Sequence, residues 1–148
     1  LIDNDLPDEV DNDMANITGT APKASGPGRE AFDELYVEEY GRQPGVFNAH
    51  AYDATAVCFL ANVYAGENDG AAVRDEMRRA ANPEGESFGP GELAEAVEAA
   101  AAGDDIDYRG ASSAVDFDDN GDMTAVAYGI YEVQERDFAE VDEVAFGG

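Results

Sequence analysis

The stretch VDFDDNGDMTAVAYGIYEVQ, residues 115–134, either binds a metal ion or forms a turn between two strands. Asp116, Asp118 and Asn120 alternate and a glycine follows, which is the first half of the spacing of a calcium-binding loop. The glutamate that should close such a loop at its twelfth position is replaced by Ala127. The flanking residues alternate or are rich in Val, Ile and Tyr, as in strands, whereas a loop of this type lies between helices. We therefore predict a turn between strands and no metal site.

Upstream of this turn, apolar residues recur with helical spacing in several segments. The first helix begins near Pro27 and ends at Gly41, because proline suits the first turn of a helix and glycine its end. The longest segment, Phe47–Tyr64, is apolar on most sides, so we expect a largely buried helix that packs against a sheet. Two shorter amphipathic helices are predicted over residues 70–82 and 89–103.

Short strands are predicted before and after these helices. The first covers Ala15–Thr20 and is ended by Pro22, and others follow the helices over residues 112–118, 126–133 and 138–146. Helices that alternate with short strands, with strands gathered at the end of the chain, indicate an α/β fold.

The charge of the chain is strongly negative, and the acids are spread along its whole length. Asp and Glu number 34 against 8 Lys and Arg, which gives a formal charge of -26, and the only lysine is Lys23. A fold with this charge repels itself in dilute buffer, whereas at about 1 M salt the Debye length falls to about 3 Å and screens the repulsion. We therefore expect a halophilic protein with an acidic surface, rather than a generic acidic protein. Nucleic acid is excluded as a partner because its phosphates would be repelled.

Few residues could carry enzyme chemistry. Cys58 lies in an apolar run and is expected to be a small core residue. His50 has no second His or Cys with which to bind zinc, and eight residues along one helix place it and Cys58 on different faces, which disfavours a nucleophile pair. The sequence shows no glycine-rich phosphate loop, nucleophile elbow or cluster of metal ligands. We therefore expect no catalytic residues, no cofactor and no enzyme activity.

Membrane-spanning and signal segments would lie in the apolar runs and at the start of the chain. No apolar run approaches the length that crosses a membrane. The chain begins at Leu1 without a methionine or a signal-peptide pattern, so we expect it to be processed or truncated.

Several stretches together resemble one protein family. GDDIDYRGASSAVDFDDNGDMTAVAYGIYEVQ, residues 103–134, and FNAHAYDATAVCFLANVY, residues 47–64, resemble the C-terminal part of branched-chain amino-acid ABC-transporter substrate-binding proteins. These form the Leu/Ile/Val-binding group of the type I periplasmic binding proteins. Residues 88–108 and ITGTAP, residues 17–22, are similar to the family's approach to its Y-x-G segment and to its crossover strand. The order of the pieces agrees and covers nearly all of the chain, with one departure: Ser113–Ala114 stands where the family has Gly-Pro.

The resemblance implies a partial type I periplasmic-binding-protein-like fold, namely the C-terminal portion of a two-lobed α/β protein with parallel sheets flanked by helices. Residues 1–21 and about 127–148 would belong to the second lobe and about 22–126 to the first lobe. The chain would cross between lobes near Thr20–Pro22 and near Gly121–Ala127. The turn in the opening stretch would then send the chain back to the other lobe.

The same resemblance implies that less than half of a full member is present. The amino-terminal sheet of the first lobe would be absent, which leaves the apolar sides of the Phe47–Tyr64 helix without their partner. We therefore expect self-association of this chain, exchange of elements between copies, or a rearranged core.

The function that the resemblance implies is solute binding without chemistry. The protein would be the extracellular, cell-surface component of an ABC importer, the equivalent of a periplasmic protein, and its membrane partner would be the ABC permease. Its ligand would be a branched-chain or related amino acid, or a small amide. The alternative is a ligand-sensing module of a receptor or regulator built on the same fold.

The candidate ligand-binding residues lie at the start of the Phe47–Tyr64 helix, beside the cleft between the lobes in the family. Asn48 and Tyr52 are four residues apart and share a face, and Asp53 follows. Tyr52 could pack against a solute and donate its hydroxyl to a carboxylate, and Asp53 could accept from an ammonium group. The structural alternative is that Asn48 caps the helix, Asp53 favours its positive end and Tyr52 belongs to the core.

Overall fold

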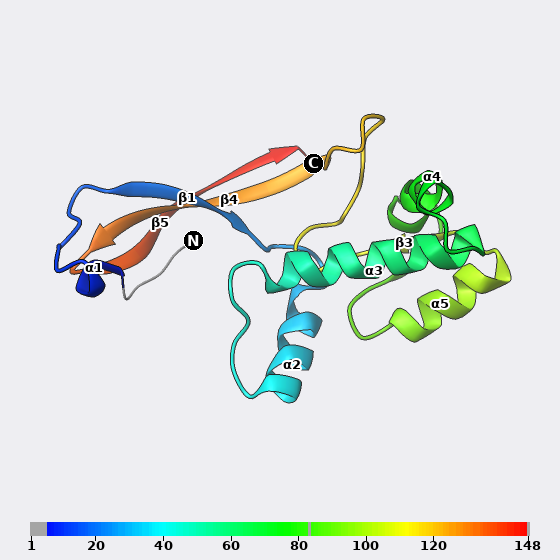
Figure 1. Ribbon diagram of the computed structural model, residues 1–148, viewed down its shortest axis with the longest axis horizontal. Coiled ribbons are helices and arrows are strands. Elements are labelled where there is room, and N and C mark those ends of the chain that lie inside the picture. Colours follow the sequence, from blue (N-terminus) through cyan, green and yellow to red (C-terminus); the bar gives the residue numbers. More distant parts are fainter. Residues whose placement is uncertain (1–5, 83, 148) are drawn as a thin grey trace.

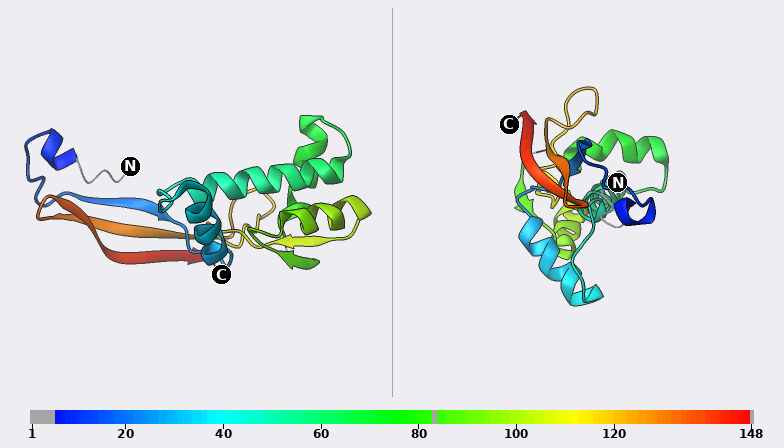
Figure 2. Two further views of the ribbon diagram at one scale, coloured as in Figure 1. Left: turned by 90° about the horizontal axis from the view of Figure 1, so that it is seen from below. Right: turned by 90° about the vertical axis from the view of Figure 1, so that its left-hand side faces the viewer.

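A computed structural model describes residues 6–82 and 84–147, which form an elongated molecule (Figures 1 and 2). An antiparallel sheet of three strands occupies one end, and helices packed around a two-stranded parallel sheet occupy the other. The chain passes into this second part, the helical body (residues 24–117), after the first strand and returns to the antiparallel sheet before the last two strands.

The antiparallel sheet has the strand order β1-β4-β5, with β1 at Thr18–Lys23, β4 at Ala125–Gln134 and β5 at Asp137–Gly147. Strands β4 and β5 form a hairpin whose two linking residues both have positive φ, 53° and 70°, as the tightest hairpin turns require. The single lysine, Lys23, lies across this sheet from β5, where its ammonium group contacts Glu140 at 2.5 Å and Glu143 at 2.7 Å.

The helical body contains α2 (Arg29–Tyr40), α3 (Asn48–Ala65), α4 (Gly70–Ala81) and α5 (Leu93–Ala102), with the parallel strands β2 (Glu86–Phe88) and β3 (Ile106–Tyr108). Glycines in the left-handed conformation end α2, α3 and α5, because this conformation carries no Cβ penalty in glycine. The core lies between α3, α4, α5 and the parallel strands, and its largest fully buried side chains there are those of Tyr108, Leu60, Ile106 and Val57.

A short helix, α1 (Leu6–Glu9), precedes the antiparallel sheet and lies at the end of the sheet far from the helical body (Figure 1). The guanidinium of Arg136, in the β4–β5 turn, donates to Asp8 Oδ1 at 2.7 Å and to the carbonyl of Pro7 at 2.7 Å. This contact ties the start of the described chain to the hairpin. Among the described residues, no helix combines the length and apolarity that membrane crossing requires.

The strand predicted over residues 112–118 is wrong. The structure has only an isolated bridge between Phe117 and Met123 in this region. The physical reason is the side chain of Asn82, which donates to the Phe117 carbonyl at 2.8 Å and accepts from the Phe117 N–H at 3.0 Å. A side chain therefore satisfies the backbone groups that a neighbouring strand would otherwise have bound.

The predicted start and end of the first strand are also wrong, since β1 begins at Thr18 and continues through Pro22. Proline is tolerated there because β1 lies at the edge of the sheet, where a strand has one unpaired side. The strands β2 and β3 were not predicted, because three residues are too few to show a period.

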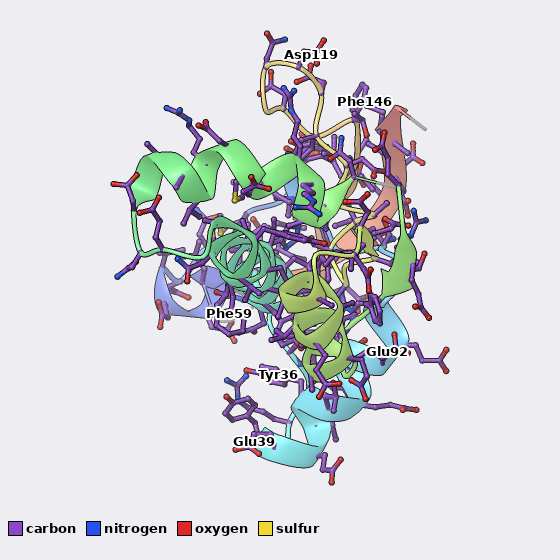
Figure 3. The ribbon with its side chains drawn as sticks, turned by 90° about the vertical axis from the view of Figure 1, so that its right-hand side faces the viewer. Tyr36, Glu39, Phe59, Glu92, Asp119 and Phe146 are labelled. Carbon is purple, nitrogen blue, oxygen red and sulfur yellow. The ribbon has the colours of Figure 1, made fainter. Side chains whose placement is uncertain are left out.

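The expectation of a largely buried α3 holds on one side of the helix only. Ala49, Val57 and Leu60 are buried against the helical body, whereas Phe59 is 54% exposed and Cys58 is exposed. The prediction that Cys58 is a core residue is therefore wrong. The helix packs mainly against α4 and α5 rather than against a broad sheet, and Figure 3 shows Phe59 on a side of α3 that is open to solvent.

Candidate functional site

A pocket of about 370 Å³ lies where the antiparallel sheet meets the helical body. Its volume falls at the lower end of the range of small-molecule sites, about 300–1,000 Å³. Its walls come from the ends of β1 and β4 that face the helical body, from the first turns of α3, and from the segment between β3 and β4. The lining residues are Pro22, Lys23, His50, Asp53, Ala54, Ser112, Ser113, Val115, Phe117, Met123, Val126, Ala127 and Tyr128.

The walls of this junction pocket are mainly apolar. Val115, Phe117, Met123 and Val126 supply side chains that carry no hydrogen-bonding group of consequence. Such a surface favours an apolar part of a ligand, because each buried CH₂ contributes about 0.8 kcal/mol.

A few polar groups border the apolar walls. His50, Asp53 and Ala54 share one face of α3 because they are three and four residues apart. The Nδ1 atom of His50 is buried and has no hydrogen-bond partner among the described residues. Ser112, whose hydroxyl donates to the Asp53 carboxylate, and Tyr128 of β4 are further polar residues of the lining. The pocket therefore combines apolar walls with polar groups at its edge, which is the usual composition of a small-molecule site.

The carboxylate of Asp53 is 2% exposed and is held by hydrogen bonds from one short segment. Its Oδ1 accepts from the Tyr108 hydroxyl and from the Ala111 N–H, both at 2.9 Å. Its Oδ2 accepts from the Ser112 N–H at 2.6 Å and from the Ser112 hydroxyl. A buried charge is stabilised when it is hydrogen-bonded in this way, so Asp53 links α3 to the segment after β3.

The other two predicted ligand residues lie elsewhere. Tyr52 packs against Phe32 of α2, with ring centroids 5.2 Å apart, and does not line the junction pocket. Burial raises the pKa of the Tyr52 hydroxyl, and a hydrogen bond with the Gly91 backbone opposes this rise. Asn48 accepts from the Gly45 N–H in the loop before α3, and Phe47 rather than Asn48 is the N-cap.

The structure therefore brings only Asp53 to the junction pocket, and direct contact of the three residues with a ligand stays a prediction. His50, Ser112 and Tyr128 were missed as pocket residues. A usable sign existed for His50 alone, since it lies three residues before Asp53 and so shares its helix face.

The turn predicted at the acidic stretch is present. The Asp118 carboxylate accepts from the Asn120 N–H at 2.8 Å and from the Asp122 N–H at 2.9 Å, and Gly121 has a φ of 87°. The N–H groups of Asp122 and Asn120 hold the pKa of Asp118 below its usual range. Asp119 lies at the tip of the turn (Figure 3). The turn itself thus engages Oδ1 of Asp118.

The remaining acidic groups near this turn do not gather into a ligand set. Burial, together with the nearby Asp107, raises the pKa of Asp116. Within residues 6–82 and 84–147, no group of three His, Cys, Asp or Glu side chains is placed to hold a metal ion.

Comparison with known proteins identifies a similar solved structure. No family model matches the chain, and no curated protein matches it. The crystal structure of the leucine-binding protein LivK from Thermotoga maritima superposes with a TM-score of 0.61 at 22% sequence identity. The superposition covers 97% of this chain and 35% of the LivK chain. The chain therefore has an α/β fold consistent with part of a type I periplasmic binding protein, as its sequence predicts, and it spans about a third of the length of that neighbour.

Proposed function

We propose that this chain forms part of a solute-binding protein whose junction pocket takes a branched-chain or related amino acid, or a small amide. The observation that carries the proposal is the pocket itself, which combines apolar walls with polar groups at the meeting point of the two parts of the molecule. The fold adds support, because the similar structure is that of a leucine-binding protein.

The chemistry of the pocket suits such a ligand. A leucine-sized side chain buried against Val115, Phe117 and Val126 would contribute about 1.5–3 kcal/mol. The charged ends of the amino acid need polar partners, which His50, Ser112 and Tyr128 can supply at the pocket edge. Direct contacts from Asn48 and Tyr52 remain part of the proposal and need separate tests, whereas both oxygens of Asp53 already accept hydrogen bonds within the protein. The reaction would be binding alone, with no enzyme activity.

The wider role follows from the kind of protein proposed. We propose the solute-binding component of an ABC importer, outside the cell and associated with its surface, with a membrane permease as its partner. The charge of -26 suits a protein that works in concentrated salt, where acidic side chains no longer repel one another over long distances.

A thermal-shift screen of amino acids and small amides on the full-length gene product, in molar KCl, tests this function. A ligand that binds only the folded state stabilises it by about 2.7 kcal/mol at a hundred times its dissociation constant. We expect a concentration-dependent rise in melting temperature for leucine, isoleucine or valine, and none for glutamate or lysine. If none of the amino acids or amides raises the melting temperature, the proposed function is wrong.

A further inference from the structure

The segment of residues 110–115, which follows β3, forms one wall of the junction pocket without belonging to a sheet. Ser112, Ser113 and Val115 line the pocket, while the structure assigns the segment no strand or helix. Its backbone N–H groups at Ala111 and Ser112 therefore need partners outside secondary structure, and both donate to the Asp53 carboxylate.

The conformation of this segment is not one that its own residues prefer. Val115 has a φ of 63°, in the left-handed region, which a β-branched residue rarely adopts. A Cβ at Gly110 would lie 2.5 Å from Asp53 Oδ2 and 2.5 Å from a Val115 methyl carbon, so only glycine permits this approach. Something outside the segment must hold it, because strained backbone persists only where its surroundings determine it.

We infer that Asp53 is a positioning residue, which holds the 110–115 segment in the conformation that forms this wall of the junction pocket. The carboxylate acts through the segment rather than by touching a solute. Its hydrogen bonds from Tyr108, Ala111 and Ser112 already occupy both oxygens. The inference rests on the proposed function only where it concerns solute affinity, since the position of the segment can be measured without a solute.

The pattern of donors requires a carboxylate. Each oxygen of Asp53 accepts from a backbone N–H, Oδ1 from Ala111 and Oδ2 from Ser112. An asparagine at this position would turn its NH₂ group toward one of these N–H groups in either orientation of the amide, so two donors would face each other. Glutamate would keep the charge but move the carboxylate away by one methylene, out of register with both N–H groups.

A matched control exists at the start of α4. Asp69 Oδ1 accepts from the N–H groups of Ala71 and Ala72, at 3.0 and 3.1 Å, in an exposed helix cap. Because one oxygen takes both bonds, asparagine can replace Asp69 with its amide oxygen in the same place. Asp69→Asn thus makes the same chemical change as Asp53→Asn, at a distance from the pocket.

The test compares Asp53→Asn, Asp53→Glu and Asp69→Asn in the full-length gene product in molar KCl, well below each melting temperature. Hydrogen exchange of the 110–115 amides reports on the segment, and calorimetric titration with L-leucine reports on the pocket. In both Asp53 variants we expect the Ala111 and Ser112 amide hydrogens to exchange at least tenfold faster than in the unmodified protein. We also expect both variants to bind leucine at least tenfold more weakly than the unmodified protein does. Asp69→Asn should change neither quantity.

Three results would overturn the positioning role of Asp53. Unchanged protection of Ala111 and Ser112 in a folded Asp53 variant would overturn it, and so would lost protection with unchanged leucine affinity. An Asp53→Glu variant that binds leucine normally while Asp53→Asn does not would indicate direct contact with an ammonium group, and would also overturn it. If the unmodified protein binds no leucine, the proposed function fails, while the exchange rates alone still show whether Asp53 holds the segment.

Discussion

The Tyr108 hydroxyl donates a hydrogen bond to Asp53 Oδ1 at 2.9 Å, and neither residue is more than 2% exposed. This contact joins the end of β3 to the second turn of α3, and both α3 and the segment that follows β3 line the junction pocket. A buried hydrogen bond to a charged acceptor is one of the stronger kinds in proteins. The pair therefore links the stability of the helical body to the geometry of the pocket.

Removal of the Tyr108 hydroxyl should destabilise the protein. Tyr108→Phe keeps the ring but leaves Asp53 Oδ1 with one donor fewer, so we expect a loss of about 1–3 kcal/mol in the free energy of unfolding. Urea denaturation in molar salt measures this loss. Tyr40→Phe, at a position that is 62% exposed, should leave the stability within experimental error. Equal stability of the two variants would show that the Tyr108 hydroxyl contributes nothing.

The same substitution should change the response to alkali. Burial and the negative charge of Asp53 raise the pKa of Tyr108, so the folded state keeps a proton that the unfolded state loses near pH 10. The contribution to stability is full below that pH and is lost as the pH rises above it. Between pH 8 and 11 the free energy of unfolding should therefore fall less steeply with pH for Tyr108→Phe than for the unmodified protein. Urea denaturation at each pH measures it.

Salt should be required for folding if the charge of -26 is an adaptation. Close-range repulsion between acids weakens as the Debye length falls from about 10 Å at 0.1 M to about 3 Å at 1 M. We predict cooperative thermal unfolding, followed by circular dichroism, in 2–3 M KCl and loss of structure in dilute buffer. A protein that is equally stable in both would remove the argument for a halophile.

Calcium should not bind specifically to the turn of residues 116–122. Asp118 Oδ1 already accepts from the N–H groups of Asn120 and Asp122, and Ala127 stands where a calcium loop needs its closing glutamate. We predict that calorimetry in molar KCl gives no saturable isotherm. A one-to-one isotherm at micromolar calcium that Asp118→Ala abolishes would prove this wrong.

Self-association should use the exposed side of α3. The only acid in this helix is Asp53, which is buried, so the side that bears Cys58 and Phe59 is uncharged in a very acidic chain. Two copies could meet there without placing carboxylates face to face. We predict by light scattering that the 148-residue chain forms dimers or larger species in molar salt.

A matched pair of variants locates that contact. Phe59→Glu introduces a charge into the uncharged side of α3 and should shift the chain to monomers. Val141→Glu, at a residue of β5 that is 44% exposed, should not. A monomeric unmodified chain, or association that survives Phe59→Glu, would contradict the use of this surface.

The sequence predicted α2, α3, α4 and α5 well because local signals determine them, but it did not predict the four-residue α1. Gly41, Gly66 and Gly103 end α2, α3 and α5 in left-handed conformations, and apolar spacing indicates the rest. It failed at residues 112–118, where Asn82, far away in the chain, binds the backbone of Phe117 in place of a neighbouring strand. No local pattern reveals such a contact.

The candidate site was predictable only in part, for a related reason. The start of α3 was identified, but the rotation of the helix sends Tyr52 toward Phe32 and Asp53 toward the segment after β3. Tyr128 reaches the pocket through the pairing of β4 with β1, where it lies opposite Pro22. The register of strands that are distant in sequence determines such contacts, and single residues do not indicate it.

The affinity for L-leucine of two variants on α3 tests most directly whether the junction pocket is the solute site. Ala54 lines the pocket, whereas Ala51, one turn earlier and also exposed, does not. Ala54→Trp should fill the pocket and Ala51→Trp should leave it open, at similar cost to the helix. In calorimetric titrations of the full-length gene product in molar KCl, we predict that Ala54→Trp binds leucine at least tenfold more weakly than the unmodified protein, and that Ala51→Trp binds it normally. Leucine affinity that is unchanged by Ala54→Trp, or absent from the unmodified protein, would contradict the assignment.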